Sequence, residues 1–249
     1  MTSFKKLQEL QAEMKNRLVL FSGLEPDLVE NVMQYAKNLV QPDTQDITDN
    51  VFVAQMMNRF QITSTVMVSQ MFEVLQRRKR LYGKEAFVKS RTIPLEDYCW
   101  CICVFLSDEM DQKVDWVFSV YDANDDGQLS KMELYILLKP CVLQTEDMET
   151  EEAIKDLIDI VMTVVDRNKN GMVDLEEFRA LVKKNVLYID LLGQCLPHKH
   201  VVKSFLRKIK NKSPMEVSKI FEEERQKGLM QPVRPGAEDD LYPIHLDLP

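Results

Sequence analysis

The segment DANDDGQLSKME (residues 122–133) decides the fold, and DRNKNGMVDLEE (residues 166–177) repeats its pattern 44 positions later. Both segments place oxygen-bearing side chains at the same intervals around a central glycine. Apolar residues with helical spacing precede and follow each segment, so helix, loop and helix occur twice. The sequence therefore predicts a pair of helix–loop–helix units.

The spacing of oxygens in both loops is typical of calcium ligation. Calcium takes roughly six to eight oxygen ligands, and the twelve-residue EF-hand loop supplies them from positions 1, 3, 5, 7, 9 and 12. Glycine fills the sixth position, where the chain turns with positive φ, and the twelfth-position glutamate can give two oxygens. The candidate ligands of the first loop are Asp122, Asn124, Asp126, the backbone carbonyl of Gln128, Ser130 and Glu133. Those of the second loop are Asp166, Asn168, Asn170, the backbone carbonyl of Met172, Asp174 and Glu177.

Two calcium (Ca2+) sites in one lobe follow from this pattern. Leu129 and Val173 occupy the eighth positions, where apolar residues pair two loops through a short antiparallel ribbon. The alternative is an EF-hand that keeps its fold without binding, which loss of the first or twelfth carboxylate would favour. Neither loop shows that loss. Three acidic side chains in each site indicate an affinity in the range of calcium sensors rather than of tight buffers.

Composition favours an all-α fold. Hydrophobic residues are 45% and charged residues 29% of the 249-residue chain, and seven glycines are too few for a turn-rich β architecture. The net charge of −8 disfavours nucleic-acid binding by the whole molecule. No apolar run approaches the roughly 20 residues that span a bilayer, and the start MTSF has neither a secretory signal nor the MG of myristoylation. Five cysteines, an odd number, indicate reduced thiols and a cytoplasmic chain.

The first half of the chain contains two eroded copies of the same unit. Helical spacing predicts helices over residues 4–21, from residue 26 to near 42, and over residues 51–60, 64–78 and 95–107. Ile47 and Ile93 stand at ribbon positions, and Asp97 stands at a twelfth position. Ala86, Val88 and Ser90 fall at the first, third and fifth places of that loop, and such residues cannot form a cation cage. We therefore expect a folded first lobe without calcium.

Three regions follow from these patterns. Residues 1–108 form the degenerate EF-hand lobe, with the basic segment 76–94 interpreted as an inserted loop. Residues 109–192 form the calcium-competent pair. Residues 193–249 comprise a helix near 201–210 and a proline-rich tail over the final twenty residues. The apolar face of this helix could dock on the protein itself; alternatively, its lysines face solvent or bind acidic tubulin tails. The expected fold is a bilobal all-α EF-hand protein.

Longer stretches resemble known families. Four EF-hand units with a silent first one resemble the neuronal calcium sensor group. A closer resemblance, over about residues 4–197, is to the calaxin family of calcium-binding proteins, which is associated with the outer dynein arms of cilia. The stretches that carry it are FKKLQEL (4–10), WVFSVYDANDDGQLSKMEL (116–134), IKDLIDIVMTVVDRNKNGMVDLEEF (154–178) and LLGQCLP (191–197). This chain departs from that family in its inactive second unit and its longer C-terminal segment.

The resemblance implies a calcium sensor and adaptor of the ciliary or flagellar axoneme that docks or regulates outer dynein arms. Its partners would be dynein-docking or other axonemal proteins, with tubulin as a further candidate, and its location the cytoskeleton of the cilium. Two alternatives remain open: a soluble regulator of a phosphatase or membrane target, like the neuronal sensors, and a static component of the axoneme. An enzyme is not expected, because no nucleophile with its base and no phosphate-binding glycine loop is present.

Two groups of soft-metal ligands have simpler interpretations. Cys99, Cys101 and Cys103 in CWCIC are expected to be small buried residues rather than metal ligands. Cys195, His198 and His200 lack a convincing fourth ligand for zinc, so we expect no zinc site there.

Overall fold

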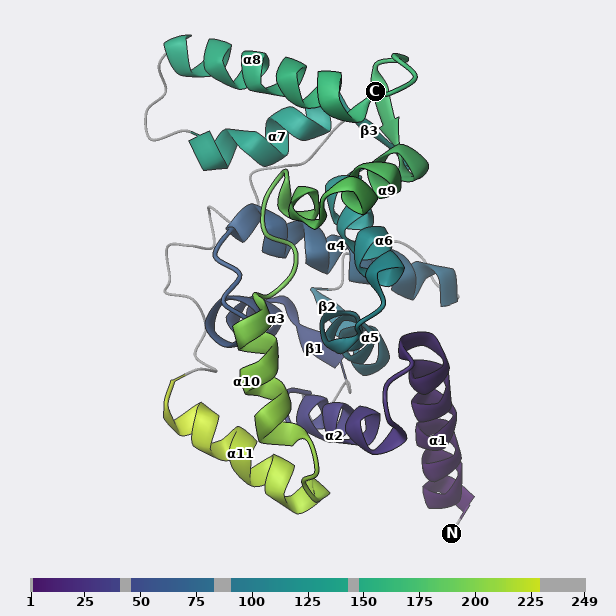
Figure 1. Ribbon diagram of the computed structural model, residues 1–249. Coiled ribbons are helices and arrows are strands. Elements are labelled where there is room, and N and C mark those ends of the chain that lie inside the picture. Colours follow the sequence, from purple (N-terminus) through teal and green to yellow (C-terminus); the bar gives the residue numbers. More distant parts are fainter. Residues whose placement is uncertain (1, 41–45, 83–90, 143–147, 229–249) are drawn as a thin grey trace. The chain divides into compact units, whose positions relative to one another are not determined.

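A computed structural model of the chain describes residues 2–40, 46–82, 91–142 and 148–228 (Figure 1). The chain divides into two compact units. The first comprises the described residues within 1–61, 75–109 and 197–234, and the second comprises those within 62–74 and 110–196. In the described part of the chain, none of the helices is both long enough and apolar enough to cross a membrane.

The first unit contains an antiparallel pair of short strands and a set of helices around it. The ribbon residues predicted from the sequence are partners: Ile47 lies opposite Ile93, and both side chains are fully buried. Its elements are α1 (Thr2–Ser22), α2 (Pro26–Lys37), β1 (Asp46–Thr48), α3 (Asp49–Ala54), a π-helical turn (Gln55–Arg59), β2 (Thr92–Pro94), α5 (Leu95–Leu106), α10 (Lys199–Ile209) and α11 (Pro214–Gln226). Helix α4 (Thr65–Tyr82) has residues in both units.

Arginine side chains lie beside the buried carboxylates in the first turns of the two helices that follow the strands, α3 and α5. Arg91 Nε lies 2.7 Å from Asp49 Oδ2, and Arg78 Nε lies 3.4 Å from Asp97 Oδ1. Asp97 is the residue that the sequence placed at a twelfth ligand position. A guanidinium therefore supplies positive charge beside this carboxylate. The absence of calcium from the first unit stays a prediction.

The two C-terminal helices belong to the first unit. Helix α10 buries the predicted face of Val201, Phe205 and Ile209. Helix α11 was not predicted, although its start has a clear signal. Ser213 and Glu216 form a capping box in which each side chain accepts a hydrogen bond from the other residue's backbone N–H.

The second unit contains the other strand pair, in which Leu129 lies opposite Val173, as predicted. Phe118, Tyr121 and Phe178 form an aromatic cluster beside the ribbon, with ring centroids 6.0 and 5.9 Å apart. Its elements are α6 (Met110–Tyr121), β3 (Gln128–Ser130), α7 (Lys131–Val142), α8 (Met148–Val165), β4 (Met172–Asp174), α9 (Leu175–Lys184) and a 3-10 turn (Val186–Asp190).

Three expectations about local structure need correction or lie outside the described residues. The loop expected over residues 76–94 is wrong at both ends, because α4 continues to Tyr82 and β2 begins at Thr92. Arginine, lysine, leucine and glutamine are good helix formers, so the basic charge of residues 76–82 does not end the helix. The single helix expected over residues 51–60 is an α-helix followed by a π-helical turn. The tail at 230–249, and residues 83–90 of the expected loop, lie outside the described part.

Replacing Phe60 by alanine tests the core of the first unit. Phe60 is fully buried, with its ring centroid 5.4 Å from those of Phe105 and Phe205. Loss of this ring should lower the free energy of unfolding by about 3–5 kcal/mol, because it leaves a cavity as well as removing apolar contact. Denaturant unfolding followed by circular dichroism measures the change. Leu20→Ala is the control, because Leu20 is 85% exposed, and equal effects of the two substitutions would contradict the described packing.

Candidate metal centre

The first loop folds its carboxylate and amide oxygens toward its own backbone. Asp122 Oδ2 accepts a hydrogen bond from the backbone N–H of Gly127 at 2.9 Å. Asn124 Oδ1 accepts one from Asp126 N at 3.0 Å, and Asp126 Oδ1 accepts one from Gln128 N at 2.8 Å. Gly127 has φ +81°, a conformation that glycine adopts without strain. These contacts hold the side chains of positions 1, 3 and 5 on the inside of the turn.

The second loop repeats this geometry with different residues. Asp166 Oδ2 accepts from Gly171 N at 2.8 Å, and Asn168 Oδ1 accepts from Asn170 N at 2.9 Å. Asn170 Oδ1 accepts from Met172 N at 2.8 Å, and Gly171 has φ +85°. Two segments that differ at most positions thus form the same turn, because aspartate and asparagine both offer an oxygen at these places.

The glutamates at the twelfth positions point back over their loops. Glu133 Oε1 accepts from Ala123 N at 3.1 Å, while its Oε2 accepts from Ser130 N and Ser130 Oγ, both at 2.8 Å. Glu177 Oε1 accepts from Arg167 N at 3.0 Å in the same way. Each glutamate lies in the first turn of the helix that leaves its loop, α7 or α9. The helix ends are therefore tied to the loops by these carboxylates.

The electrostatics of the first loop favour a bound cation. Burial raises the pKa of Asp122, the neighbouring Glu133 raises it further, and hydrogen bonds from backbone N–H groups such as that of Gly127 oppose the rise. Two carboxylates in a partly buried loop repel each other, and a divalent cation would remove that repulsion. The ligand set contains only oxygen, so its chemistry fits a hard cation such as calcium.

The predicted ligands of each loop lie within one turn and its exit helix. The structure brings the side chains of the first loop's Asp122, Asn124, Asp126, Ser130 and Glu133 into one hydrogen-bonded network. Across the described residues, no cluster of three or more His, Cys, Asp or Glu side chains forms a metal site by itself. An EF-hand cage differs from such a cluster, because amide, hydroxyl and carbonyl oxygens fill half of the ligand positions in both loops.

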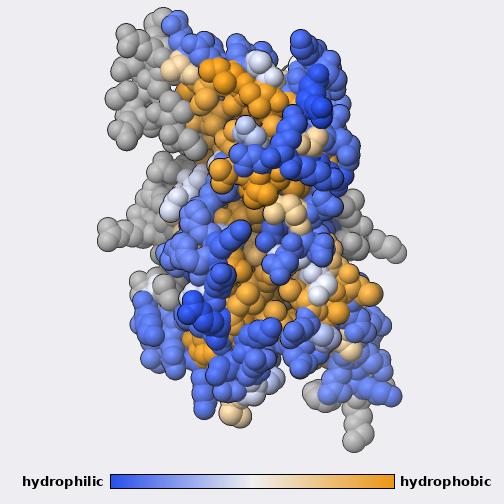
Figure 2. Space-filling view, in the orientation of Figure 1, coloured by the Kyte–Doolittle hydropathy of each residue, from blue (hydrophilic) through white to orange (hydrophobic). Residues whose placement is uncertain are grey.

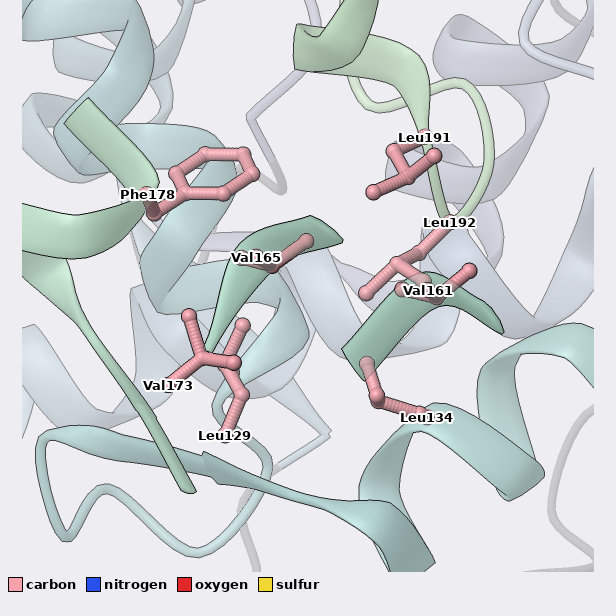
Figure 3. Close-up of a pocket in the computed structure, with 8 residues that line it drawn as sticks. All are labelled: Leu129, Leu134, Val161, Val165, Val173, Phe178, Leu191 and Leu192. Atoms are coloured by element: carbon pink, nitrogen blue, oxygen red, sulfur yellow. The ribbon is translucent and has the colours of Figure 1, made fainter. Parts of the chain in front are cut away.

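An apolar cluster lies directly behind the ribbon (Figure 3). Leu129 and Val173 are 2% and 1% exposed, and their side chains face the same small cavity as residues of α7, α8 and α9. This packing fixes both loops to one core, so a movement of one exit helix changes the surroundings of the other loop. The lining residues are Leu129, Leu134, Val161, Val165, Val173, Phe178, Leu191 and Leu192.

The segment after α9 is attached to the helix that enters the first loop. Tyr121, which directly precedes Asp122, donates from its hydroxyl toward the carbonyl oxygens of Ile189 and Gly193 at 3.0 and 2.9 Å. Trp116 Nε1 donates to the carbonyl oxygen of Cys195 at 3.2 Å. Burial raises the pKa of Tyr121 well above its usual value, so its hydroxyl stays protonated. The sequence did not reveal this attachment, because a tyrosine at the end of an amphipathic helix is equally compatible with simple core packing.

Gly193 allows the close packing of this segment. Its φ is +135°, and a Cβ at this position would lie 2.6 Å from the Cε of Met67. The Sγ of Cys195 lies 3.6 Å from the Sδ of the same methionine. The segment LLGQCLP therefore has a structural role in the second unit that requires glycine at this position.

The cysteine side chains of both groups are buried, and the two histidines are exposed. The Cys99, Cys101 and Cys195 side chains are fully buried, and burial raises the pKa of the Cys103 thiol to about 12. A buried thiol that remains protonated is a poor metal ligand. His198 and His200 are exposed and stack on each other, with ring centroids 5.7 Å apart. These positions agree with the structural roles expected from the sequence.

The second unit also exposes apolar side chains on its helices. Hydrophobic residues gather over α7 and α8 in the space-filling view (Figure 2). Met132 of α7 is 55% exposed, and Ile160 and Val164 of α8 are also exposed. Ile160 and Val164 are four residues apart on one helix face.

Comparisons with known proteins agree with this geometry. A family model of the EF-hand domain pair matches residues 111–183, which include both loops. The chain is 28% identical to calaxin of Xenopus laevis over 210 residues, which cover 82% of this chain and 94% of that protein. It is 31% identical to calaxin of Homo sapiens over 97 residues, or 39% of this chain and 46% of that protein, so this match spans about half of the human relative. It is 29% identical to guanylyl cyclase-activating protein 1 of Gallus gallus over 136 residues, covering 55% of this chain and 63% of that protein.

The fold and the loops define an all-α EF-hand protein of the calcium-binding class, as predicted. The chain is a calaxin-like EF-hand protein, because matches to calaxin recur in several species and one of them extends along most of the chain.

Tyr121→Phe tests the attachment of the segment after α9. Removing the hydroxyl leaves the carbonyl oxygens of Ile189 and Gly193 without this donor, and the first of these contacts is buried, so the free energy of unfolding should fall by about 1–3 kcal/mol. Backbone amides of residues 189–196 should also exchange hydrogen faster. Tyr188→Phe is the control, because Tyr188 lies at the same segment but is half-exposed. Unchanged exchange in Tyr121→Phe would show that the hydroxyl does not hold the segment.

Proposed function

We propose that this protein is a calcium sensor with two sites, one in each of the loops 122–133 and 166–177. The observation that carries the proposal is the repetition of one hydrogen-bonded turn in both loops, with a glutamate from the exit helix placed over each. The ligands would be Asp122, Asn124, Asp126, the carbonyl of Gln128, Ser130 and Glu133 in the first site. In the second they would be Asp166, Asn168, Asn170, the carbonyl of Met172, Asp174 and Glu177.

The loops' own residues would convert ion binding into helix movement. Calcium would supply the positive charge that the clustered carboxylates lack. Glu133 and Glu177 would exchange backbone N–H donors for the cation, and each would move the first turn of its own helix. The ribbon pair of Leu129 and Val173 would couple the two sites, since both residues pack in the same apolar cluster. The exposed apolar residues of α7 and α8 would then change position relative to the loops.

The proposed biological role is that of a non-enzymatic sensor and adaptor of the ciliary or flagellar axoneme, which docks or regulates outer dynein arms. Support comes from the similarity to calaxins, which covers 82% of this chain in the Xenopus laevis match. The partners would be dynein-docking or other axonemal proteins, and tubulin. A second candidate is a soluble regulator of a target enzyme, which the similarity to a guanylyl cyclase-activating protein favours. A static axonemal component is the third.

Substitution of the twelfth-position glutamates tests the two sites. Glu133→Gln should weaken calcium binding at the first loop by at least about tenfold, or about 1.4 kcal/mol, because a bidentate carboxylate becomes a neutral amide. Calorimetric titration should find two sites in the unaltered protein, one in Glu133→Gln or Glu177→Gln at moderate calcium, and none in the double variant. Glu176→Gln is the control, because Glu176 is exposed and points to Arg179. Two unaltered sites in the double variant would disprove the ligand assignment.

Crosslinking in isolated motile cilia tests the biological role. The expected products are dynein-docking or other axonemal proteins, with yields that differ between calcium and a chelator. The Glu133→Gln/Glu177→Gln variant should give the chelator pattern at all calcium concentrations. Equal products in both conditions would support a static component instead. Crosslinks only to soluble enzymes or membrane receptors would support the second candidate, a soluble regulator of a target enzyme, and would overturn the axonemal proposal.

A further inference from the structure

In the first unit, α11 packs on α2, and α10 packs on both α2 and α5; the surface that these two helices cover is here called the cleft. Helix α10 contributes Val201, Phe205 and Ile209, and helix α11 contributes Val217 and Phe221, and each of these side chains is at most 5% exposed. The ring of Phe221 contacts Tyr35 of α2 edge-on, with centroids 5.6 Å apart. The arrangement is that of an amphipathic helix bound in an apolar groove, supplied within one chain.

The floor of this cleft holds a buried arginine with unused hydrogen-bond donors. Arg59 is 8% exposed, and its guanidinium lies over the ring of Phe205 at 4.8 Å from the centroid. Its Nη1 lies 3.4 Å from Glu224 Oε1 of α11. In the described part of the chain, its Nε and Nη2 have no hydrogen-bond partner. Buried guanidinium groups normally pair through two parallel hydrogen bonds, so this contact satisfies only part of the group.

Glu224 is the acidic residue that α11 brings to this arginine. It is 2% exposed, and it accepts hydrogen bonds from Tyr35 Oη at 3.0 Å and from Lys208 Nζ at 2.6 Å. The carboxylate is thus divided among three donors, which explains its incomplete contact with Arg59. Burial raises the pKa of Tyr35 well above its usual value, so Tyr35 is a donor here at neutral pH.

Helix α11 is held by few contacts. Val217, Phe221 and Glu224 are its only buried residues among the described ones, while most of its other side chains are half-buried or exposed. One further side-chain hydrogen bond joins Gln34 Nε2 to Ser218 Oγ at 3.1 Å. Burying a valine and a phenylalanine stabilises the bound helix by about 3–6 kcal/mol. The burial of a charge and the loss of conformational entropy on ordering the helix both oppose this gain. The bound and released states of α11 therefore differ little in free energy.

We propose that this cleft is a binding site for an acidic amphipathic helix of a partner protein, and that α11 is its built-in, displaceable occupant. The α11 sequence defines what the site accepts: apolar side chains four residues apart, as at Val217 and Phe221, and a carboxylate one turn further on, as at Glu224. A partner helix whose carboxylate contacts Arg59 through two parallel hydrogen bonds would use the donors that α11 leaves unpaired. The site lies in the unit that lacks calcium ligands, so it does not depend on the proposed calcium function.

Release of α11 in the full-length protein is the first test. Phe221→Ala removes one apolar anchor without touching the buried charges, and Glu224→Gln removes the carboxylate. Both should raise hydrogen exchange of the α11 amides by about tenfold or more, with α2 and α5 remaining protected. Met215→Ala and Glu222→Gln are the matched controls, because Met215 is 72% exposed and the Glu222 side chain is also exposed. Equal exchange in variants and controls would show that α11 is not held as described.

Binding in trans is the second test. The probe is a labelled peptide with the sequence of residues 213–228, added to full-length Phe221→Ala protein and followed by fluorescence anisotropy. It should bind this variant at least about tenfold more tightly than the unaltered protein, whose own helix occupies the cleft. A peptide with glutamine at position 224 should bind at least about tenfold more weakly, with and without calcium.

Four results would overturn the proposal. The first is equal peptide binding to the variant and the unaltered protein, and the second is no binding to either. The third is equal binding of the two peptides, which would show that Arg59 does not select a carboxylate. The fourth is calcium dependence of peptide binding, which would contradict the assignment of the peptide site to the unit without predicted calcium ligands. If the two loops proved not to bind calcium, the expected peptide binding would be unchanged.

Discussion

The antiparallel ribbon that joins two loops is the interaction on which the rest of the structure depends. It occurs twice, with Ile47 opposite Ile93 in the first unit and Leu129 opposite Val173 in the second. A single helix–loop–helix segment cannot bury its apolar face alone, and the ribbon brings the four helices of a pair around one core. Because both ribbon residues are buried in each unit, the register of one loop fixes that of its partner.

The two units keep the same ribbon but differ in the charged residues around it. In the second unit, clustered oxygens turn inward and their mutual repulsion favours a cation. In the first unit, Arg91 and Arg78 lie beside Asp49 and Asp97, so charge is balanced within the chain. The ribbon is retained in both, because its stability comes from buried isoleucine, leucine and valine rather than from ligands. A unit of this kind can therefore keep its fold whichever residues occupy the ligand positions of its loops.

Features set by local spacing could be predicted from the sequence, and features set by distant partners could not. The loop oxygens, the glycines with positive φ and the ribbon residues recur at fixed intervals, so the spacing alone predicts their positions. The hydroxyl of Tyr121 contacts carbonyl oxygens some seventy positions away, and no local pattern encodes that contact. The basic residues 76–82 were predicted as a loop because charge and a nearby glycine outweighed helix propensity. Helix α11 was missed although its capping box was visible, because its apolar stripe consists of two residues.

The weak apolar stripe of α11 also explains why its binding depends on buried charge. A helix with a broad apolar face is stabilised by the apolar surface area that it buries, and its position does not require a specific polar contact. The apolar face of α11 is too small for that. Glu224 fixes the position of the helix through its hydrogen bonds, but burying its carboxylate is unfavourable unless hydrogen-bond donors pair with it. Arg59, Tyr35 and Lys208 provide those donors, but the geometry leaves two of the arginine's donor nitrogens unused. A contact that is specific but incompletely satisfied can be replaced by a better one, which distinguishes this helix from α10 and its three buried apolar anchors.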